Sequence, residues 1–314
     1  PIGSLNDRMT DQLFRLRYLI GLEPRASPRL IHVVVNDGTR TALGVTRWDR
    51  RVFGQVLDLL RESEARVIAC DIFFQDASLA NNDAPLLDAL RRSTTVVLPV
   101  LVIPEERADA SDNPIAADRK SLQGQRITIN PVVTRNGNPP IGEDVVPPFL
   151  GLSEAAVTFG HINASPDLDG VNRRVPLLYR YWEGYVPALS LAAVMEYFGV
   201  TERNIAISFG RYIILRDARI GDDERREVRI PIDGQGRMIL DVPGPWVDSF
   251  ASFPVQNLIA ASLDDQSRLH LFDLLEGSLV VISDVSTTNR DHAPGVFESV
   301  YPLSGLHMTA LNSM

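Results

Sequence analysis

The sequence predicts an α/β protein with a mainly parallel (mixed) sheet flanked by helices on both faces. Three observations predict this class. Short, continuous apolar runs, which are typical of strands buried on both faces, recur along the chain. Within residues 30–103, segments with the apolar periodicity of an amphipathic helix lie between these apolar runs. The composition, 45% hydrophobic and 23% charged over 314 residues, is that of a globular protein with enough chain to form a large core.

The elements follow one another in the order of a doubly wound sheet. "LIHVVVN" (30–36) and "RVIACDIFF" (66–74) are expected to be buried strands, as are "TTVVLPVLV" (94–102) and, near the end, "GSLVVISDV" (277–285). Three segments between and after them are expected to be helices: 49–65, 82–93 and 252–262.

The middle of the chain departs from this alternation. Over the range 104–150 the periodicity fails and the chain is polar and rich in proline, which predicts a long irregular excursion over the surface. After it, "DG" at 169–170 and "DGQG" at 233–236 lie between strand-like runs and predict an added antiparallel hairpin region. A helix over 186–199, closed by Gly199, separates the two hairpin signals.

The composition also excludes classes of partner. A net charge of −9 argues against nucleic acid, because binding phosphates requires clustered Lys and Arg. The single cysteine, Cys70, lies in an apolar run and excludes an internal disulfide framework. No run reaches the ~18 consecutive apolar residues that would span a bilayer.

Both ends of the sequence have helical character. Residues 1–29 open with an amphipathic segment in which Met9, Leu13, Leu16 and Ile20 form an apolar stripe. Residues 306–314 also read as helix. The main domain is expected over residues 30–305. The stripe is a candidate dimer seam, and packing against its own domain is an equally simple alternative.

Motifs of catalysis, cofactor binding and metal binding are missing from the sequence. There is no GxGxxG or GxxxxGK[ST] phosphate loop, and the five histidines lack metal-ligand spacing. The "DLDG" turn at 167–170 does not continue into a calcium loop, because Pro176 stands where the bidentate Glu should be. The sequence therefore predicts no enzyme activity, no cofactor and no metal.

Acidic residues stand at the ends of three predicted parallel strands: Asp37, Asp71 and Asp284. Ligands of open α/β sheets bind outside the carboxyl ends of the strands, so these acids are candidates for one pocket. Carboxylates that converge there repel one another unless cations or a proton relieve them. The alternative is that each aspartate caps a helix or satisfies a turn, as Asp often does.

The order of several segments resembles the type-2 CHASE domain, a cyclase- and histidine-kinase-associated extracytoplasmic sensor module of bacterial transmembrane receptors. The segments that carry the resemblance are "VVVNDGT", "GVTRWDRRVF", "CDIFFQD", "GHINASPDLDGVNRRVPL", "VPALSLAAV", "IPIDGQGRMILDVPGP", "GSLVVISDV" and "YPLSGLHMTALNSM". They run nearly from end to end of the chain.

This resemblance implies the extracytoplasmic (periplasmic) part of a bacterial inner-membrane receptor. Residues 1–29 would then continue a first membrane helix, and residues 306–314 would lead into the next. A cytoplasmic adenylate or guanylate cyclase, kinase or diguanylate cyclase would lie beyond. The expected partners are an unknown small ligand, the receptor's own membrane helices and a second copy of the chain. The candidate ligand-binding residues are Asp37, Trp48, Arg50, Asp71, Asp76, Arg173, Asp284 and Asp291. The alternative function is a structural dimerisation module without a small-molecule ligand.

Overall fold

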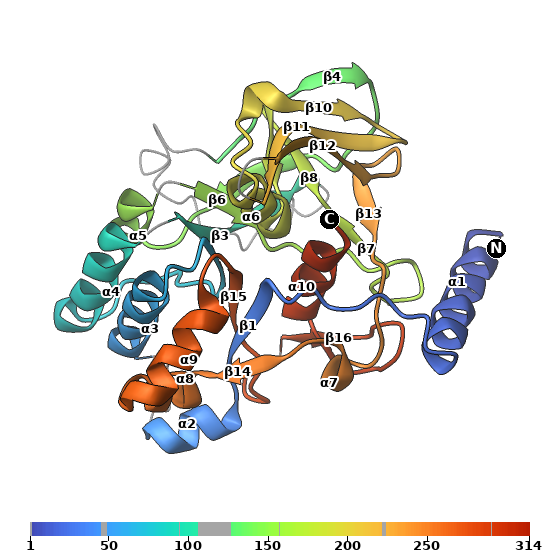
Figure 1. The fold of residues 1–314 in the computed structure, drawn as a ribbon. Helices are drawn as coiled ribbons and strands as arrows, with labels where there is room; N and C mark the ends of the chain where they lie inside the picture. Colours follow the sequence, from blue (N-terminus) through green and yellow to red (C-terminus); the bar gives the residue numbers. More distant parts are fainter. Residues whose placement is uncertain are drawn as a thin grey trace.

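The computed structural model describes residues 2–44, 49–93, 95–105, 127–156, 158–221, 224–289 and 291–314. Its central element is a seven-stranded sheet in the order β14-β1-β15-β2-β3-β5, with β6 also paired to β3 (Figure 1). The strands are β1 (Leu30–Val35), β2 (Val67–Asp71), β3 (Thr95–Pro104), β5 (Gly142–Val146), β6 (Thr158–His161), β14 (Ser252–Pro254) and β15 (Leu279–Asp284). Only β5 runs antiparallel to its neighbour, so the predicted mainly parallel sheet is confirmed.

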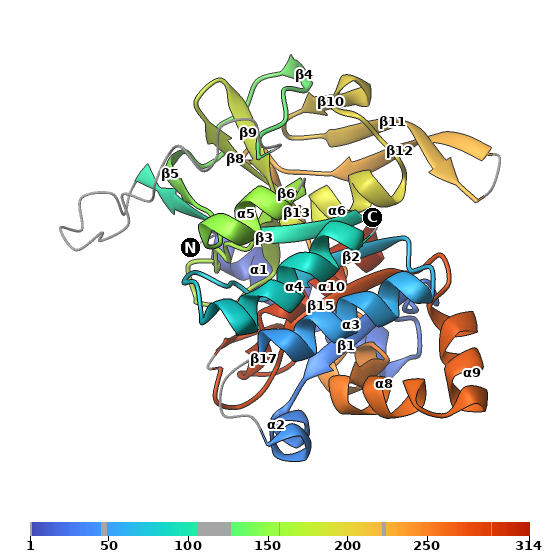
Figure 2. The ribbon, with the colours of Figure 1, turned by 90° about the vertical axis from the view of Figure 1, so that its left-hand side faces the viewer.

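Helices cover both faces of this sheet, as the sequence predicts (Figure 2). One face carries α3 (Arg50–Glu62), α4 (Ala80–Arg92), α8 (Val255–Ser262) and α9 (Asp265–Leu275). The other face carries α6 (Leu189–Tyr197) and α10 (Ser304–Ser313). Because successive side chains of a strand point to opposite faces, the apolar run of β2 supplies both layers. Ile68 and Cys70 pack in the first core, and Val67 and Ala69 pack in the second.

Other parts of the chain form smaller sheets, which are antiparallel except for the parallel pairing of β4 with β10 in the largest of them. The largest is four-stranded, in the order β12-β11-β10-β4, and contains β4 (Val132–Arg135), β10 (Ile205–Ser208), β11 (Tyr212–Ile220) and β12 (Glu224–Pro231). The two-stranded sheets join β7 (Arg174–Pro176) to β13 (Arg237–Ile239), β8 (Leu178–Tyr181) to β9 (Gly184–Pro187), and β16 (His292–Ala293) to β17 (Tyr301–Pro302).

The segment 104–150 contains more regular structure than its composition suggests. Within its described part, β5 extends the edge of the main sheet and β4 joins the four-stranded sheet. Val145 and Val146 are buried there, so contacts distant in sequence hold a segment whose local pattern is weak. Residues 106–126 of the predicted excursion lie outside the described residues.

The first and last helices are held in different ways. α1 (Ile2–Leu19) lies at the outside of the molecule, beside the loops around β7 and β16 (Figure 1). α10 lies inside, and every residue from Ser304 to Leu311 is buried against the sheet and α6. The described helices do not include one that is both long enough and apolar enough to cross a membrane.

Candidate functional site

The candidate site lies at the carboxyl ends of three adjacent parallel strands. In the sheet register Val35 of β1 stands beside Asp284 of β15, and Ser283 of β15 stands beside Asp71 of β2. A cavity of about 1380 Å³ opens at this edge. Its acidic and basic lining residues are Asp49, Arg50, Arg51, Asp71, Asp76, Asp284 and Asp291. This is the edge at which open α/β sheets hold their ligands.

Arg50 fixes one wall of the cavity. It is the first residue of α3 and is buried, and its guanidinium forms an ion pair with Asp83 of α4 and donates to the backbone carbonyl of Asp76. The same group lies over the rings of Phe149 and Phe74, at 4.7 and 5.2 Å from their centroids. Arg50 therefore anchors the loop that follows β2, and its charge is already balanced by Asp83.

Asp284 is also balanced by a partner. Its carboxylate accepts a hydrogen bond from Arg40 Nη2 at 2.6 Å and another from the Ser286 backbone N–H at 2.9 Å. Asn289 Nδ2 donates to the Asp284 carbonyl at 2.8 Å. Arg40 belongs to α2 (Asp37–Leu43), whose start is fixed by a capping box between Asn36 and Thr39. The loop after β15 is thus tied to the loop after β1.

Asp71 and Asp291 behave differently from these paired acids. Both are partly buried, and neither side chain makes a hydrogen bond or ion pair within the described part of the chain. Burial, and then the nearby charge of Asp291, raises the pKa of Asp71 well above its usual value. Burial also raises the pKa of Asp291, where the charge of Asp284 acts in the same direction and His292 opposes it. The cavity thus holds two carboxyl groups that are costly to ionise.

The rest of the cavity wall is mixed in character. Apolar groups come from the loop after β2 and from the residue after β6, and they include Ile72, Phe73, Phe74, Leu79 and Ile162. Hydrogen-bonding groups come from Gln75, Ser78, Asn81, Asn82 and Asn289. Apolar walls with a few converging polar groups are typical of small-molecule sites.

The structure brings five of the predicted residues to this cavity: Arg50, Asp71, Asp76, Asp284 and Asp291. Asp37 does not line it. Its Oδ1 atom instead accepts hydrogen bonds from the Thr287 backbone N–H at 3.1 Å and from Thr287 Oγ1 at 3.2 Å. Asp37 therefore joins the segments that follow β1 and β15. This role is structural, which is the alternative to ligand binding that the sequence left open. Trp48 lies outside the described residues, although Gly44 and Asp49, on either side of that gap, line the cavity.

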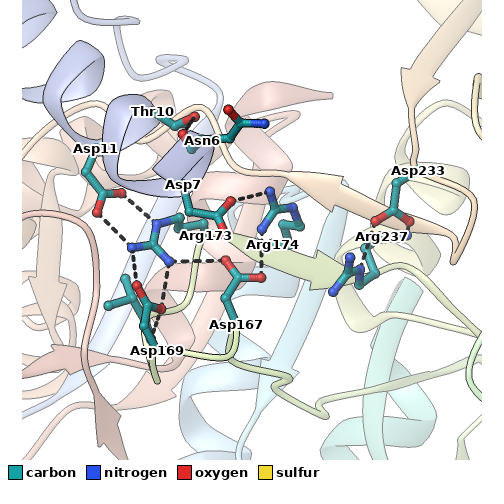
Figure 3. A network of polar contacts seen from close by, with 11 residues as sticks. Asn6, Asp7, Thr10, Asp11, Asp167, Asp169, Arg173, Arg174, Asp233 and Arg237 are labelled. Carbon is teal, nitrogen blue, oxygen red and sulfur yellow. Dashed lines mark hydrogen bonds and ion pairs between the residues drawn. The ribbon is translucent and has the colours of Figure 1, made fainter. Parts of the chain in front are cut away.

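Arg173 is also placed away from the cavity, which corrects its assignment to the pocket. It is 2% exposed and lies under α1, where it binds Asp11 through Nε at 2.7 Å and Nη2 at 2.8 Å (Figure 3). It also binds Asp169 at 2.8 Å and Asp167 at 3.3 Å. Three carboxylates around one guanidinium explain its burial.

Sequence reasoning missed Arg40 and Asn289. Both complete the surroundings of Asp284, and Arg40 is the cation that relieves this acid. A signal for Arg40 existed, because it follows the predicted strand end at Asp37 by less than one helical turn. No local pattern marks Asn289, since its role depends on the path of the loop after β15.

Replacing Asp71 with Asn is expected to stabilise the ligand-free protein at neutral pH. A carboxyl whose pKa is raised on folding contributes stability only at low pH, and this contribution is lost as the pH rises through the raised pKa. The variant should therefore unfold at a higher temperature than the wild type at pH 7, and the difference should shrink toward zero as the pH falls through 3.8, because the carboxyl then becomes protonated in the unfolded chain as well. Thermal unfolding followed by circular dichroism over this range measures it. A destabilised variant at pH 7 would contradict the assignment.

Across the part of the chain that the structure describes, no group of three or more His, Cys, Asp or Glu side chains is arranged to hold a metal ion.

A mainly parallel sheet with helices on both faces and a polar cavity at its carboxyl edge defines the class of open-sheet α/β domains. Comparison with protein families narrows this class. The family model described as the CHASE2 domain matches residues 1–314, the whole chain. The chain belongs to the CHASE2 family, whose members are extracytoplasmic sensor domains of signalling receptors. Comparison with curated proteins and with solved structures finds no match.

Proposed function

We propose that this chain is the periplasmic input domain of a bacterial inner-membrane receptor and that it binds a small ligand in the cavity at the carboxyl edge of the sheet. The output is a cytoplasmic adenylate or guanylate cyclase, kinase or diguanylate cyclase. The domain itself performs no chemistry. Family membership supports the sensory role, and the cavity supports the ligand.

One observation carries the ligand proposal: Asp71 and Asp291 face the same cavity as acids without a partner among the described residues. Asp76, the third acid without an ion pair among the described residues, is exposed to solvent, and the remaining charged groups of the wall are paired, Arg50 with Asp83, Arg51 with Asp49 and Asp284 with Arg40. A ligand with an ammonium or guanidinium group would offset the cost of ionising Asp71 and Asp291. Its apolar part would contact Phe73, Phe74 and Ile162.

The positions of the chain ends support the receptor role. The labelled N- and C-termini lie at about the same height in both ribbon views, and α2, which follows β1 at the carboxyl edge, lies well below them (Figures 1 and 2). The four-stranded sheet lies above both termini in these views, so in a receptor whose membrane helices continue α1 and α10 the carboxyl edge of the main sheet would lie on the side opposite to the four-stranded sheet. A ligand acts there by differential affinity for two arrangements of those helices.

Thermal-shift screening of the 314-residue chain tests the proposal. We expect amines, amino acids, polyamines or guanidinium compounds to raise the unfolding temperature, because a ligand that binds only the folded state stabilises it. The double variant Asp71→Asn, Asp291→Asn should lose the shift. The matched control Asp273→Asn, at an exposed position of α9, should keep it. Stabilisation by anionic compounds only, or equal stabilisation of the double variant, would overturn the cationic assignment.

The second candidate function is a structural dimerisation module without a ligand. The observation that favours it is the apolar stripe of α1, which is exposed in the structure: Leu13 is 62% and Leu16 is 53% accessible. Under this alternative the double variant would leave receptor output unchanged, whereas a charge placed in the stripe would abolish it. Both variants assayed in one receptor therefore separate the two functions.

A further inference from the structure

The two faces of α1 have different surroundings. One face is fixed to its own domain through charged side chains: Asp7 binds Arg174 at 2.7 Å and Asp11 binds Arg173 at 2.7 Å (Figure 3). Arg17 also binds Asp241 at 2.6 Å. Arg15 adds a hydrogen bond to the Val296 carbonyl at 2.9 Å. The domain therefore sets the rotation of α1 about its axis.

The opposite face of α1 is apolar and open to solvent. The stripe has the exposed fractions Met9 57%, Leu13 62%, Leu16 53% and, directly after the helix, Ile20 58%. Packing of this stripe against its own domain, the alternative that the sequence left open, is not what the structure shows. Exposed apolar rows of this kind mark interaction surfaces.

The spacing of the stripe identifies the kind of partner. Met9, Leu13, Leu16 and Ile20 are separated by four, three and four residues, which is the a/d pattern of a two-stranded coiled coil. In this register Leu13 and Ile20 occupy a positions, and Met9 and Leu16 occupy d positions. The same register places Asn6, which is exposed, at the preceding a position. A single Asn at an a position fixes the register and the number of strands.

We propose that α1 pairs with α1 of a second copy of the chain as a parallel, in-register coiled coil, in which Asn6 meets Asn6 of the partner subunit. A second copy fits because it offers the same uncharged stripe, already set in the same rotation by its own domain, and because a two-fold dimer uses one patch twice. The parallel direction follows from Asn6: an antiparallel pair centred on Leu13 would place this amide opposite the apolar Ile20. The same direction is required if both helices enter one membrane, and this second argument, like the expected strong pairing in a membrane-bound receptor, rests on the proposed function.

The apolar interface of the proposed coiled coil is short, and its length determines under which conditions the dimer forms. Its apolar positions cover only about two heptads, and short coiled coils are marginal in water. We therefore expect weak association of the isolated 314-residue chain and strong pairing in the membrane-bound receptor, where tethering raises the effective concentration.

Cysteine cross-linking in the full-length receptor in native membranes tests the proposal. Single cysteines replace Met9, Leu13 and Leu16 in a background in which the buried Cys70 and any other cysteine are changed to Ser. We expect disulfide-linked dimers at these positions and at least tenfold less at the matched control Arg8→Cys, which is exposed but outside the stripe. Cross-linking without this periodicity would overturn the proposal, as would no dimer at any position. Cross-linking of Met9→Cys to Leu16→Cys in mixed receptors, without Met9→Cys homodimers, would show an antiparallel pair and overturn it too.

A second measurement separates the seam from the fold and from the ligand site. Leu13→Glu with Leu16→Glu should abolish cross-linking through Met9→Cys in the receptor while leaving the thermal unfolding of the isolated chain within a few degrees of the wild type, because both positions are exposed. A chain unfolded by these changes would place the stripe in the core and contradict the proposal. Cross-linking does not require a ligand. A receptor that forms the cross-linked dimer but does not respond to cationic compounds would therefore refute only the proposed ligand-sensing function. A receptor that responds without cross-linking refutes only the seam.

Discussion

Replacing Arg173 with Ala is expected to destabilise the domain by about 4 kcal/mol, because removing one partner of a buried ion cluster leaves the others desolvated and unpaired. The side chains of Arg173, Asp167 and Asp11 are 2%, 6% and 14% exposed, so water cannot replace the lost guanidinium without opening the structure. The effect should appear first in α1, since Arg173 binds Asp11 through two hydrogen bonds. Denaturant unfolding gives the free energy, and hydrogen exchange of the α1 amides shows the local release.

The matched control for this substitution lies in the same region (Figure 3). Arg237 pairs with Asp233 at 2.8 Å, but their side chains are 27% and 31% exposed. Arg237→Ala should therefore cost less than about 1 kcal/mol, as other water-accessible pairs do. Arg173→Lys is expected to fall between the two, because an ammonium keeps the charge but not the planar, bidentate geometry. Equal costs for Arg173→Ala and Arg237→Ala would show that the cluster does not hold α1.

Mild acid is expected to destabilise the domain through buried histidines. His161 is fully buried on β6, and neither of its ring nitrogens has a hydrogen-bond partner among the described residues. Burial, with a smaller effect from His307, lowers the pKa of His161 to about 3, and burial lowers that of His307 to about 4. Because both values lie below the ordinary 6.5, the unfolded chain binds more protons, and stability is lost as the pH falls below 6.5. At pH 5 each group should cost about 2 kcal/mol relative to pH 8.

His161→Phe tests this expectation while keeping an aromatic ring beside Tyr179, whose ring centroid lies 4.8 Å from that of His161. The stability difference between pH 8 and pH 5, measured by denaturant unfolding, should shrink by about 2 kcal/mol in the variant. His270→Phe is the matched control, because His270 is exposed on α9 and water surrounds its imidazole before and after unfolding. An undiminished acid sensitivity in His161→Phe would mean that this ring is not protonated on unfolding.

The central strands were predictable because a strand buried on both faces must be apolar throughout. β1, β2 and β15 show this pattern, so the carboxyl edge, and with it Asp71 and Asp284, followed from the sequence. β4 and β5 were not predicted. Their short runs lie among glycines and prolines, and pairing with β10 and β3 stabilises them from elsewhere in the chain.

The surroundings of the acids were less predictable than their positions. Arg173 is six residues from Asp167 but 162 residues from Asp11, and its pairing with α1 has no local signature. Asp284 ends the buried strand β15, and Asp37 begins the helix that follows β1. The paths of the chain at these two points bring Asp37 to Thr287 and Asp284 to Arg40. Sequence periodicity identifies the edge of a sheet, whereas loop paths decide which side chains face the cavity.

The burial of α10 has a mechanical consequence. Gly305 is so close to Tyr301 that a Cβ atom at this position would lie 2.6 Å from the ring, and the Tyr301 hydroxyl donates to the Gly305 carbonyl at 3.1 Å. α10 is therefore held by packing in the core along its length, whereas α1 is held at the surface by a small number of ion pairs. A force applied to α10 must shear the core before the helix moves. A force applied to α1 needs only to break contacts between the helix and the surface of the domain, chiefly those of Arg173 and Arg174 and those that Arg15 and Arg17 make, so α1 can move more easily than α10.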